Sequence, residues 1–269
     1  MRIRIGYELH LDFAQPTAAV FILNVHSSQI GSLEAPDLMR LDPLVPSTFF
    51  HDLYGNPCVR VLAPAGRLSV SADTVIRDSG EPEPWPVGVA ATPPADLPSE
   101  TLPFLLPSRY CEVEMLSDFA WNTFGPLPAG WSQVEAILNW CKANVTFGYP
   151  FARPTKTAAD VFYERKGVCR DFMHLAITFC RALNIPARYA TGYLGDIGVP
   201  YSPAPMDFSA YFQVFLGGKW WSVDARHNAR RIGRVMQAFG RDAADVAIVT
   251  TFGPHTLSKF FVRTDELID

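Results

Sequence analysis

Gly167-Val168-Cys169-Arg170-Asp171-Phe172 is the stretch around which this chain is organised. After it, apolar residues recur at the spacing of one helical face: Phe172, Leu175, Ala176, Phe179 and Leu183. Cys169 is therefore predicted at the first turn of a buried helix, where unpaired backbone N–H groups carry partial positive charge. A thiolate is stabilised at such a place, and the neighbouring Arg170 adds to the effect. The pattern indicates a cysteine nucleophile. The alternative is one more buried small residue, as most free cysteines are.

Composition limits the classes of function. The chain has 269 residues, a hydrophobic fraction of 48% and a formal net charge of −4, without blocks of like charge. One large or two medium domains are expected, and nothing favours nucleic acid or a membrane surface as a partner. No apolar run is long enough to span a bilayer, and the N-terminus does not resemble a signal peptide.

The five cysteines are odd in number and widely spaced, and no two of them form a C-x-x-C pair. This argues against a disulfide framework and a zinc ribbon, and it favours a reducing, cytoplasmic location. No His, Cys and Asp set has the spacing of metal ligands, so we expect neither a metal nor another cofactor. The oligomeric state is left open.

The first 77 residues read as short strands. Between Arg2 and Phe13, apolar and polar residues alternate, which is typical of a half-buried strand. Thr17 to Val25 reads as a second strand, and shorter runs follow around 59–62, 68–70 and 74–76. The pattern predicts a β-sandwich-like domain over residues 1–77.

Residues 78–108 are rich in proline and are predicted to be a linker or a strap laid over a surface. Residues 109–269 form the predicted core. It opens with helices: one near 117–124, and two with capping-box spacing, at Ser132-Gln-Val-Glu135 and Thr157-Ala-Ala-Asp160. The Cys169 helix comes next and is predicted to end at Asn184.

The core then turns to strands. Gly217-Gly218 predicts a two-residue hairpin, so paired residue numbers should sum to 435. In that register Asp224 faces Tyr211, and Ser209 lies diagonally across from Asp224 on the same face. A base at position 209 would be oriented by the Asp224 carboxylate.

These motifs resemble the transglutaminase-like superfamily, the papain-like cysteine enzymes. The resemblance rests on three stretches: G-V-C-R-D-F at 167–172, S-A-Y-F-Q-V-F at 209–215, and G-G-K-W-W-S-V-D-A-R-H-N at 217–228. The nearest match is the bacterial group of transglutaminase-like cysteine proteases, in which a β-sandwich precedes the catalytic core. The resemblance implies an α+β fold, with Cys169 as nucleophile and Asp224 as orienting acid.

One position departs from the family pattern, because the usual histidine before Ala-Tyr is Ser209. A serine hydroxyl is not a base at neutral pH, and losing a general base costs on the order of 10²–10⁴ in rate. His227 is a candidate replacement if the strand breaks after Asp224. His174 is rotated roughly 140° from Cys169 and lies about 7.5 Å further along the helix, so it is expected to be a core histidine.

An arginine cluster follows the hairpin: Arg226, Arg230, Arg231 and Arg234. Surface pairing with Asp242 and Asp245 is one interpretation. A patch near the cleft that holds a carboxylate is the other.

Three functions remain open. The first is a hydrolase that cuts peptide or isopeptide bonds through a thioester on Cys169. The second is acyl transfer to an amine, which shares that first half-reaction. The third is a catalytically degenerate member that binds a peptide or protein without turnover, for which Ser209 is the direct argument.

Overall fold

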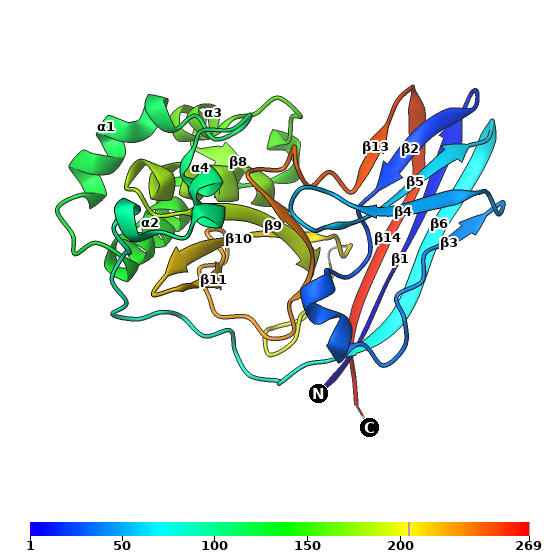
Figure 1. Cartoon of the computed structure of the whole chain (residues 1–269), viewed down its shortest axis with the longest axis horizontal. Helices are drawn as coiled ribbons and strands as arrows, with labels where there is room; N and C mark the ends of the chain where they lie inside the picture. Colours follow the sequence, from blue (N-terminus) through cyan, green and yellow to red (C-terminus); the bar gives the residue numbers. More distant parts are fainter. Residues whose placement is uncertain (204, 269) are drawn as a thin grey trace.

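The computed structural model describes residues 1–203 and 205–268. The chain forms two lobes (Figure 1): a β-sandwich, and a lobe in which helices cover one face of an antiparallel sheet. The α+β fold class predicted from the sequence is confirmed.

The sandwich consists of two four-stranded antiparallel sheets. The first has the order β14 (His255–Leu267), β1 (Arg2–Phe13), β6 (Gly66–Arg77) and β3 (Arg40–Asp42). The second has the order β13 (Val249–Thr251), β2 (Thr17–Phe21), β5 (Pro57–Ala63) and β4 (Ser47–His51). Their facing side chains form a continuous apolar core between the sheets. A short 3-10 turn, η1 (Ser27–Ser32), lies between β2 and β3.

The alternation of apolar and polar residues predicted for the first strand appears in β1 as an alternation of buried and more exposed side chains. Ile3, Ile5 and Leu9 are fully buried, while Arg4 is exposed. β1 pairs with β6 along its whole length, so the two short runs predicted within 68–76 are a single strand. β2 ends at Phe21, earlier than predicted.

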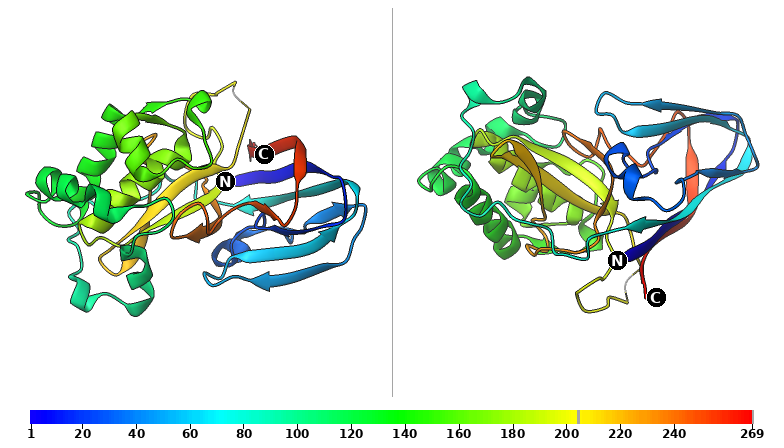
Figure 2. Two further views of the ribbon diagram at one scale, coloured as in Figure 1. Left: turned by 90° about the horizontal axis from the view of Figure 1, so that it is seen from above. Right: turned by 60° about the horizontal axis from the view of Figure 1, so that its bottom comes forward.

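The end of the chain completes the sandwich. β14 pairs with the free edge of β1, and β13 pairs with β2. The two chain ends consequently lie close together (Figure 2). The predicted core of 109–269 is therefore too long, because Val249–Leu267 belongs to the sandwich. A strand as long as β1 leaves a long row of unpaired backbone groups, and β14 satisfies them.

The second lobe is built on the sheet β11 (Lys219–Val223), β10 (Ser209–Leu216), β9 (Ala187–Tyr193) and β12 (Val235–Gly240), in that order. Its helices are α1 (Val113–Phe124), α2 (Trp131–Asn144), α3 (Ala158–Glu164) and α4 (Cys169–Ala182), with a short turn η4 (Tyr149–Phe151). A two-residue parallel pair joins β7 (Thr146–Phe147) to β8 (Lys166–Gly167).

Helix α4 is the centre of this lobe. Every residue from Asp171 to Ala182 is buried, because α1, α2 and α3 pack on one side and β9 and β10 on the other. A helix that is apolar on most of its circumference needs such a position.

The two predicted helix starts differ in outcome. Thr157 caps α3 as predicted, with its hydroxyl accepting the Asp160 N–H and the Asp160 carboxylate accepting the Thr157 N–H. Ser132 is not a cap, because α2 begins at Trp131 after Gly130. A Cβ at Gly130 would lie 2.4 Å from the Val89 carbonyl oxygen, so this close approach to the strap requires glycine.

The proline-rich residues 78–108, called the strap below, connect the two lobes. The strap leaves β6, runs along the second lobe and reaches α1 (Figure 1). It carries two 3-10 turns, η2 (Pro94–Asp96) and η3 (Ser99–Leu105). Its backbone is bonded to the lobe at Ala90–Gly130 and at Glu83–Arg231.

Candidate active site

Cys169 is the first residue of helix α4. The Asp171 carboxylate accepts the Val168 N–H at 3.0 Å and so satisfies one of the unpaired donors of this helix end. A Cβ at Gly167 would lie 2.7 Å from the Cβ of Asp171, so glycine allows the loop to pass close to the helix. These local contacts fix where the thiol emerges.

Arg170 does not play the part predicted for it. Its Nη2 atom lies 3.0 Å from Asp171 Oδ1 and donates to the Arg153 carbonyl oxygen at 2.7 Å. The guanidinium charge is therefore paired within the loop. Arg170 lowers the pKa of the Cys169 thiol through its backbone N–H, which donates a hydrogen bond to the sulfur.

The Cys169 thiol is half-buried, and its pKa is raised. Burial is the largest cause and the negative charge of Asp207 is the next, while the Ala210 N–H and the Arg226 charge act in the opposite direction. The stabilised thiolate predicted from the helix end is therefore wrong for the free protein, because desolvation outweighs the helix N-terminus. At neutral pH Cys169 carries its proton.

The hairpin has the predicted register. Phe212 pairs with Val223 and Leu216 pairs with Lys219, so the numbers of each pair sum to 435. Ala210, Phe212, Val214, Leu216 and Val223 belong to the core that contains α4. Because side chains alternate along a strand, Ser209, Tyr211 and Asp224 share the other face. Ser209 is the first residue of β10. It directly precedes Ala210, whose backbone N–H lowers the pKa of the Cys169 thiol.

Asp224 follows the last residue of β11 and holds a tight turn. Its Oδ1 atom accepts the backbone N–H of Arg226 at 2.9 Å and that of His227 at 3.0 Å. Its Oδ2 atom lies 2.8 Å from His227 Nδ1. The strand does break after Asp224, and the break brings His227 back to the carboxylate.

Asp224 is ionised at neutral pH. Burial acts to raise its pKa, but the hydrogen bond from His227 and the charge of Arg234 outweigh it and lower the pKa to about 2. With Asp224 charged, the Nδ1 atom of His227 is the donor and Nε2 is left as the acceptor. This is the arrangement of an oriented base.

The arginine cluster is only partly open to solvent, because Arg231 and Arg234 are buried. Arg234 is buried, with Nε 2.9 Å from Glu83 Oε1 and Nη2 3.6 Å from Asp224 Oδ2. Arg230 donates to the carbonyl oxygens of Pro82 and Glu83 in the strap. The predicted surface partners are engaged elsewhere: Asp245 binds Arg241, and Asp242 accepts the Tyr110 N–H. The surface interpretation is therefore wrong.

Arg226 is the member of the cluster that approaches the thiol. Its guanidinium carbon lies 3.6 Å from the centre of the Phe147 ring, and the Phe147 ring is 5.4 Å from that of Tyr149. Tyr149 is 57% exposed and interacts electrostatically with Cys169 and Asp207. Together these residues form an aromatic and charged rim around Cys169.

His174 is a core residue. Its Nε2 atom accepts the Ala243 N–H at 3.2 Å, and its ring stacks on that of Tyr110 with 5.0 Å between centroids. Burial holds its pKa well below the usual range, so it stays neutral. It thus ties α4 to the neighbouring loops, the structural role expected of it.

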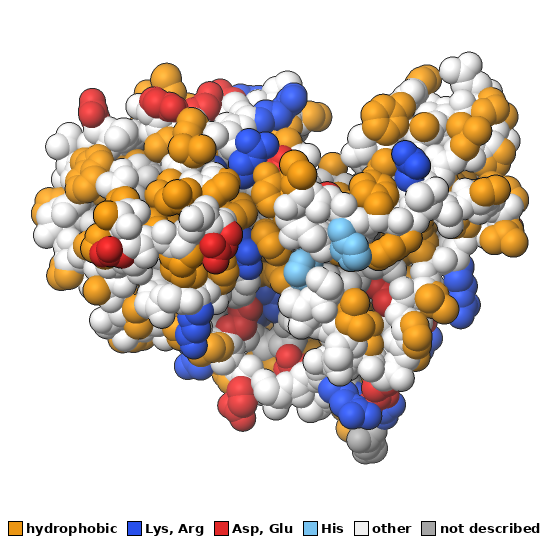
Figure 3. Space-filling view, in the orientation of Figure 1, with side chains coloured by type: hydrophobic (Ala, Val, Ile, Leu, Met, Phe, Trp, Pro, Cys, Tyr) orange, Lys and Arg blue, Asp and Glu red, His pale blue; other side chains and the backbone are white. Residues whose placement is uncertain are grey.

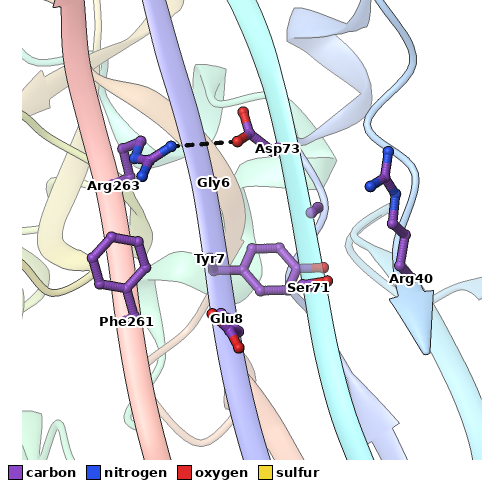
Figure 4. Close-up of a pocket in the computed structure, with 9 residues that line it drawn as sticks. Gly6, Tyr7, Glu8, Arg40, Ser71, Asp73, Phe261 and Arg263 are labelled. Carbon is purple, nitrogen blue, oxygen red and sulfur yellow. Dashed lines mark hydrogen bonds and ion pairs between the residues drawn. The ribbon is translucent and has the colours of Figure 1, made fainter. Parts of the chain in front are cut away.

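Two hollows in the described chain are lined by residues of the sandwich. One of about 340 Å³ opens in the sandwich between η1 and β4. Another, of about 240 Å³, lies over β1, β6 and β14, where Arg263 contacts Asp73 (Figure 4). The space-filling view shows a notch between the two lobes (Figure 3).

Within residues 1–203 and 205–268, no group of His, Cys, Asp or Glu side chains is arranged to hold a metal. No helix there is both long and apolar enough to cross a membrane.

The chain is similar to a known protein family, to a solved structure and to an uncharacterized protein. Residues 120–225 match the model of the transglutaminase-like superfamily, a span that includes Cys169, Ser209 and Asp224 and ends just before His227. A solved structure of a candidate cysteine protease from Cytophaga hutchinsonii is 31% identical, with a TM-score of 0.86 over 100% of this chain and 91% of that one. An uncharacterized Mycobacterium leprae protein, ML0607, is 28% identical over 117 residues, which is 42% of each chain. The matched part is thus less than half of that relative's length.

Proposed function

Because this chain belongs to the transglutaminase-like superfamily, whose enzymes are of the cysteine protease and transglutaminase type, we propose that it cleaves amide bonds of peptides or proteins through a thioester on Cys169. The observation that carries the proposal is the 2.8 Å contact between Asp224 and His227. It gives the chain an oriented imidazole although the usual histidine position is occupied by Ser209.

In this mechanism His227 Nε2 takes the proton of the neutral Cys169 thiol as the sulfur attacks the carbonyl carbon. Backbone N–H groups at the start of α4 stabilise the oxyanion. The C–N bond breaks, the amine leaves with the proton from His227, and a thioester remains on Cys169. Water, deprotonated by the same imidazole, then attacks the thioester carbonyl carbon. The C–S bond breaks, the proton on His227 returns to the Cys169 sulfur, and the acid product leaves.

The rim around Cys169 supports a peptide substrate, since the exposed Tyr149 and the half-buried Phe147 and Arg226 can contact one. The acyl acceptor, water or an amine, decides between hydrolysis and transglutamination. The half-reaction that forms the thioester is common to both.

A fluorescent casein substrate tests the proposal, with dansylcadaverine added in parallel to detect acyl transfer. Cys169→Ala should abolish turnover, and His227→Asn should lower the rate by roughly 10²–10⁴, the usual contribution of a general base. His255→Asn is the matched control, because His255 lies on β14 and bonds Thr251. Wild-type rates in His227→Asn would rule out His227 as the base.

The raised pKa of Cys169 and the serine at position 209 favour a second candidate, a degenerate member that binds peptides without turnover. Ser209→His separates the two. If the wild type is inactive and this variant gains hydrolysis, the rest of the site is intact and lacks only its base. Casein binding measured by fluorescence anisotropy would then remain in both proteins.

A further inference from the structure

A row of four charged or titratable side chains runs from the strap to the site. Glu83 contacts Arg234 at 2.9 Å, Arg234 approaches Asp224 at 3.6 Å, and Asp224 contacts His227 at 2.8 Å. The Arg234 and Asp224 side chains are only 3% and 2% exposed. In such a dry environment each charge depends strongly on its neighbours.

Two N–H donors compete for one oxygen in this row. Asp224 Oδ2 is the acceptor for His227 Nδ1, and it is also the carboxylate oxygen nearest to Arg234 Nη2. The 3.6 Å separation from Arg234 is longer than a hydrogen bond. Asp224 Oδ1 is already occupied by two backbone N–H groups. Arg234 therefore stops short of a hydrogen bond to the oxygen that accepts from His227 Nδ1.

Glu83 is what holds Arg234 there. Among the described residues, both terminal nitrogens of Arg234 lack a hydrogen-bond acceptor, whereas its Nε atom donates to Glu83 Oε1. The guanidinium also lies 4.3 Å from the centre of the Tyr211 ring. A buried guanidinium with unsatisfied donors would move to the nearest carboxylate if this restraint were lost.

The Glu83 carboxylate is itself fixed by its backbone. Its N–H donates to the Arg231 carbonyl oxygen at 2.8 Å, and its own carbonyl oxygen accepts from Arg230 Nε at 2.6 Å. The strap is thus bonded on both sides of the Glu83 peptide to the segment that carries Arg234.

We propose that Glu83 is a positioning residue: it holds Arg234 short of hydrogen-bond distance from Asp224 Oδ2, so that this oxygen stays available to His227 Nδ1. The proposal rests on the function proposed above and gives the strap a part in it. Glu83 contacts no reacting atom and acts through Arg234 and Asp224.

The test reads the tautomer of His227 from the ¹⁵N chemical shifts of its ring nitrogens, at a pH where the imidazole is neutral. The wild type should show the Nδ1–H tautomer that Asp224 requires. Glu83→Gln keeps the shape but removes the charge, and it should shift His227 toward the Nε2–H tautomer. It should also lower kcat/KM for peptide hydrolysis about tenfold or more, as expected for a misplaced base. Glu81→Gln, an exposed strap position two residues earlier, should behave as the wild type.

A double variant distinguishes competition from general damage. Glu83→Gln combined with Arg234→Met removes the competing cation and should restore the Nδ1–H tautomer. Glu83→Asp, which keeps the charge, should lie between the wild type and Glu83→Gln. Backbone amide spectra identify folded variants. An unchanged tautomer in Glu83→Gln, or no recovery in the double variant, overturns the proposal.

These outcomes separate the two proposals, because the tautomer is measured without substrate. If the tautomer responds as expected and no variant hydrolyses peptide, the proposed function fails and the positioning role stands. If hydrolysis depends on His227 but the His227 tautomer is unchanged in Glu83→Gln, only the positioning role fails.

Discussion

Cys169 and Asp224 are both removed from water, yet their pKa values shift in opposite directions. Both are desolvated, which favours the neutral form of each. Asp224 stays ionised because a hydrogen bond from His227 and the charge of Arg234 stabilise its carboxylate. Cys169 has no comparable cation, since Arg170 is paired with Asp171, and Asp207 adds a repulsive charge. The site therefore combines a protonated thiol with an ionised acid and needs a base to transfer the proton.

The ionised state of Asp224 makes a prediction about pH. Its folded pKa of about 2 lies below the ordinary value of 3.8. A group with a depressed pKa contributes stability that is fully present above the unfolded value and is lost as pH falls through the folded value. The difference of nearly two pH units corresponds to about 2 kcal/mol.

We therefore expect this contribution to vanish between about pH 4 and pH 2. Urea unfolding of the wild type and of Asp224→Asn, followed from pH 6 to pH 2, measures it. The gap between the two unfolding free energies should narrow by about 2 kcal/mol over this range. A gap that stays constant would show that Asp224 titrates normally in the folded protein.

At the scale of elements, helix ends decide where the site residues lie. α3 follows a side-chain cap, Thr157, whereas α2 follows Gly130, where the strap passes too close for a Cβ. α4 begins at Cys169, directly after Val168, whose N–H donates to the Asp171 carboxylate. The capping-box spacing in the sequence identified the start of α3. It failed for α2, because a contact with the strap, which is distant in the sequence, sets the boundary of that helix.

The two helix starts can be compared directly by mutation. Thr157→Ala removes a capping hydroxyl and should lower the free energy of unfolding by about 1 kcal/mol. Ser132→Ala is the matched control, because Ser132 has the sequence pattern of a cap but lies inside α2, and its effect should stay within about 0.5 kcal/mol. Chemical denaturation monitored by circular dichroism measures both. Equal losses in the two variants would contradict the assigned caps.

At the scale of the whole molecule, the chain closes on itself. The sandwich is completed by strands from the two ends of the sequence, and the site-bearing lobe is inserted between them. The strap then binds the inserted lobe through Glu83 and Ala90. The two lobes are therefore joined at several points.

This closure predicts that β14 stabilises the entire protein. Val262 is 3% exposed in the sandwich core, while its neighbour Phe261 is 44% exposed. Val262→Asp buries an unpaired charge and should cost several kcal/mol, lowering stability in both lobes if they unfold together. Phe261→Asp should cost far less. Urea unfolding followed by tryptophan fluorescence, which reports the second lobe, measures the effect, and a Val262→Asp curve like that of the wild type would disprove the closure.

The sequence by itself determined the features that depend on local periodicity and turn chemistry. The alternation of β1, the buried face of α4 and the hairpin register about Gly217-Gly218 follow from side-chain spacing, which is a property of neighbouring residues. The position of Cys169 at a helix start and the common face of Ser209 and Asp224 follow from the same rules. The α+β class and the superfamily could be inferred from these stretches.

Only the tertiary structure decided the charges and the partners. The raised pKa of Cys169, the contact of Arg234 with Glu83 and the return of His227 to Asp224 depend on burial and on segments far apart in the chain. The assignment of β14 to the sandwich depends on an edge pairing between the two ends of the chain. Electrostatic interactions in a folded protein are set by distance and desolvation in three dimensions, and neither quantity can be read from residue spacing.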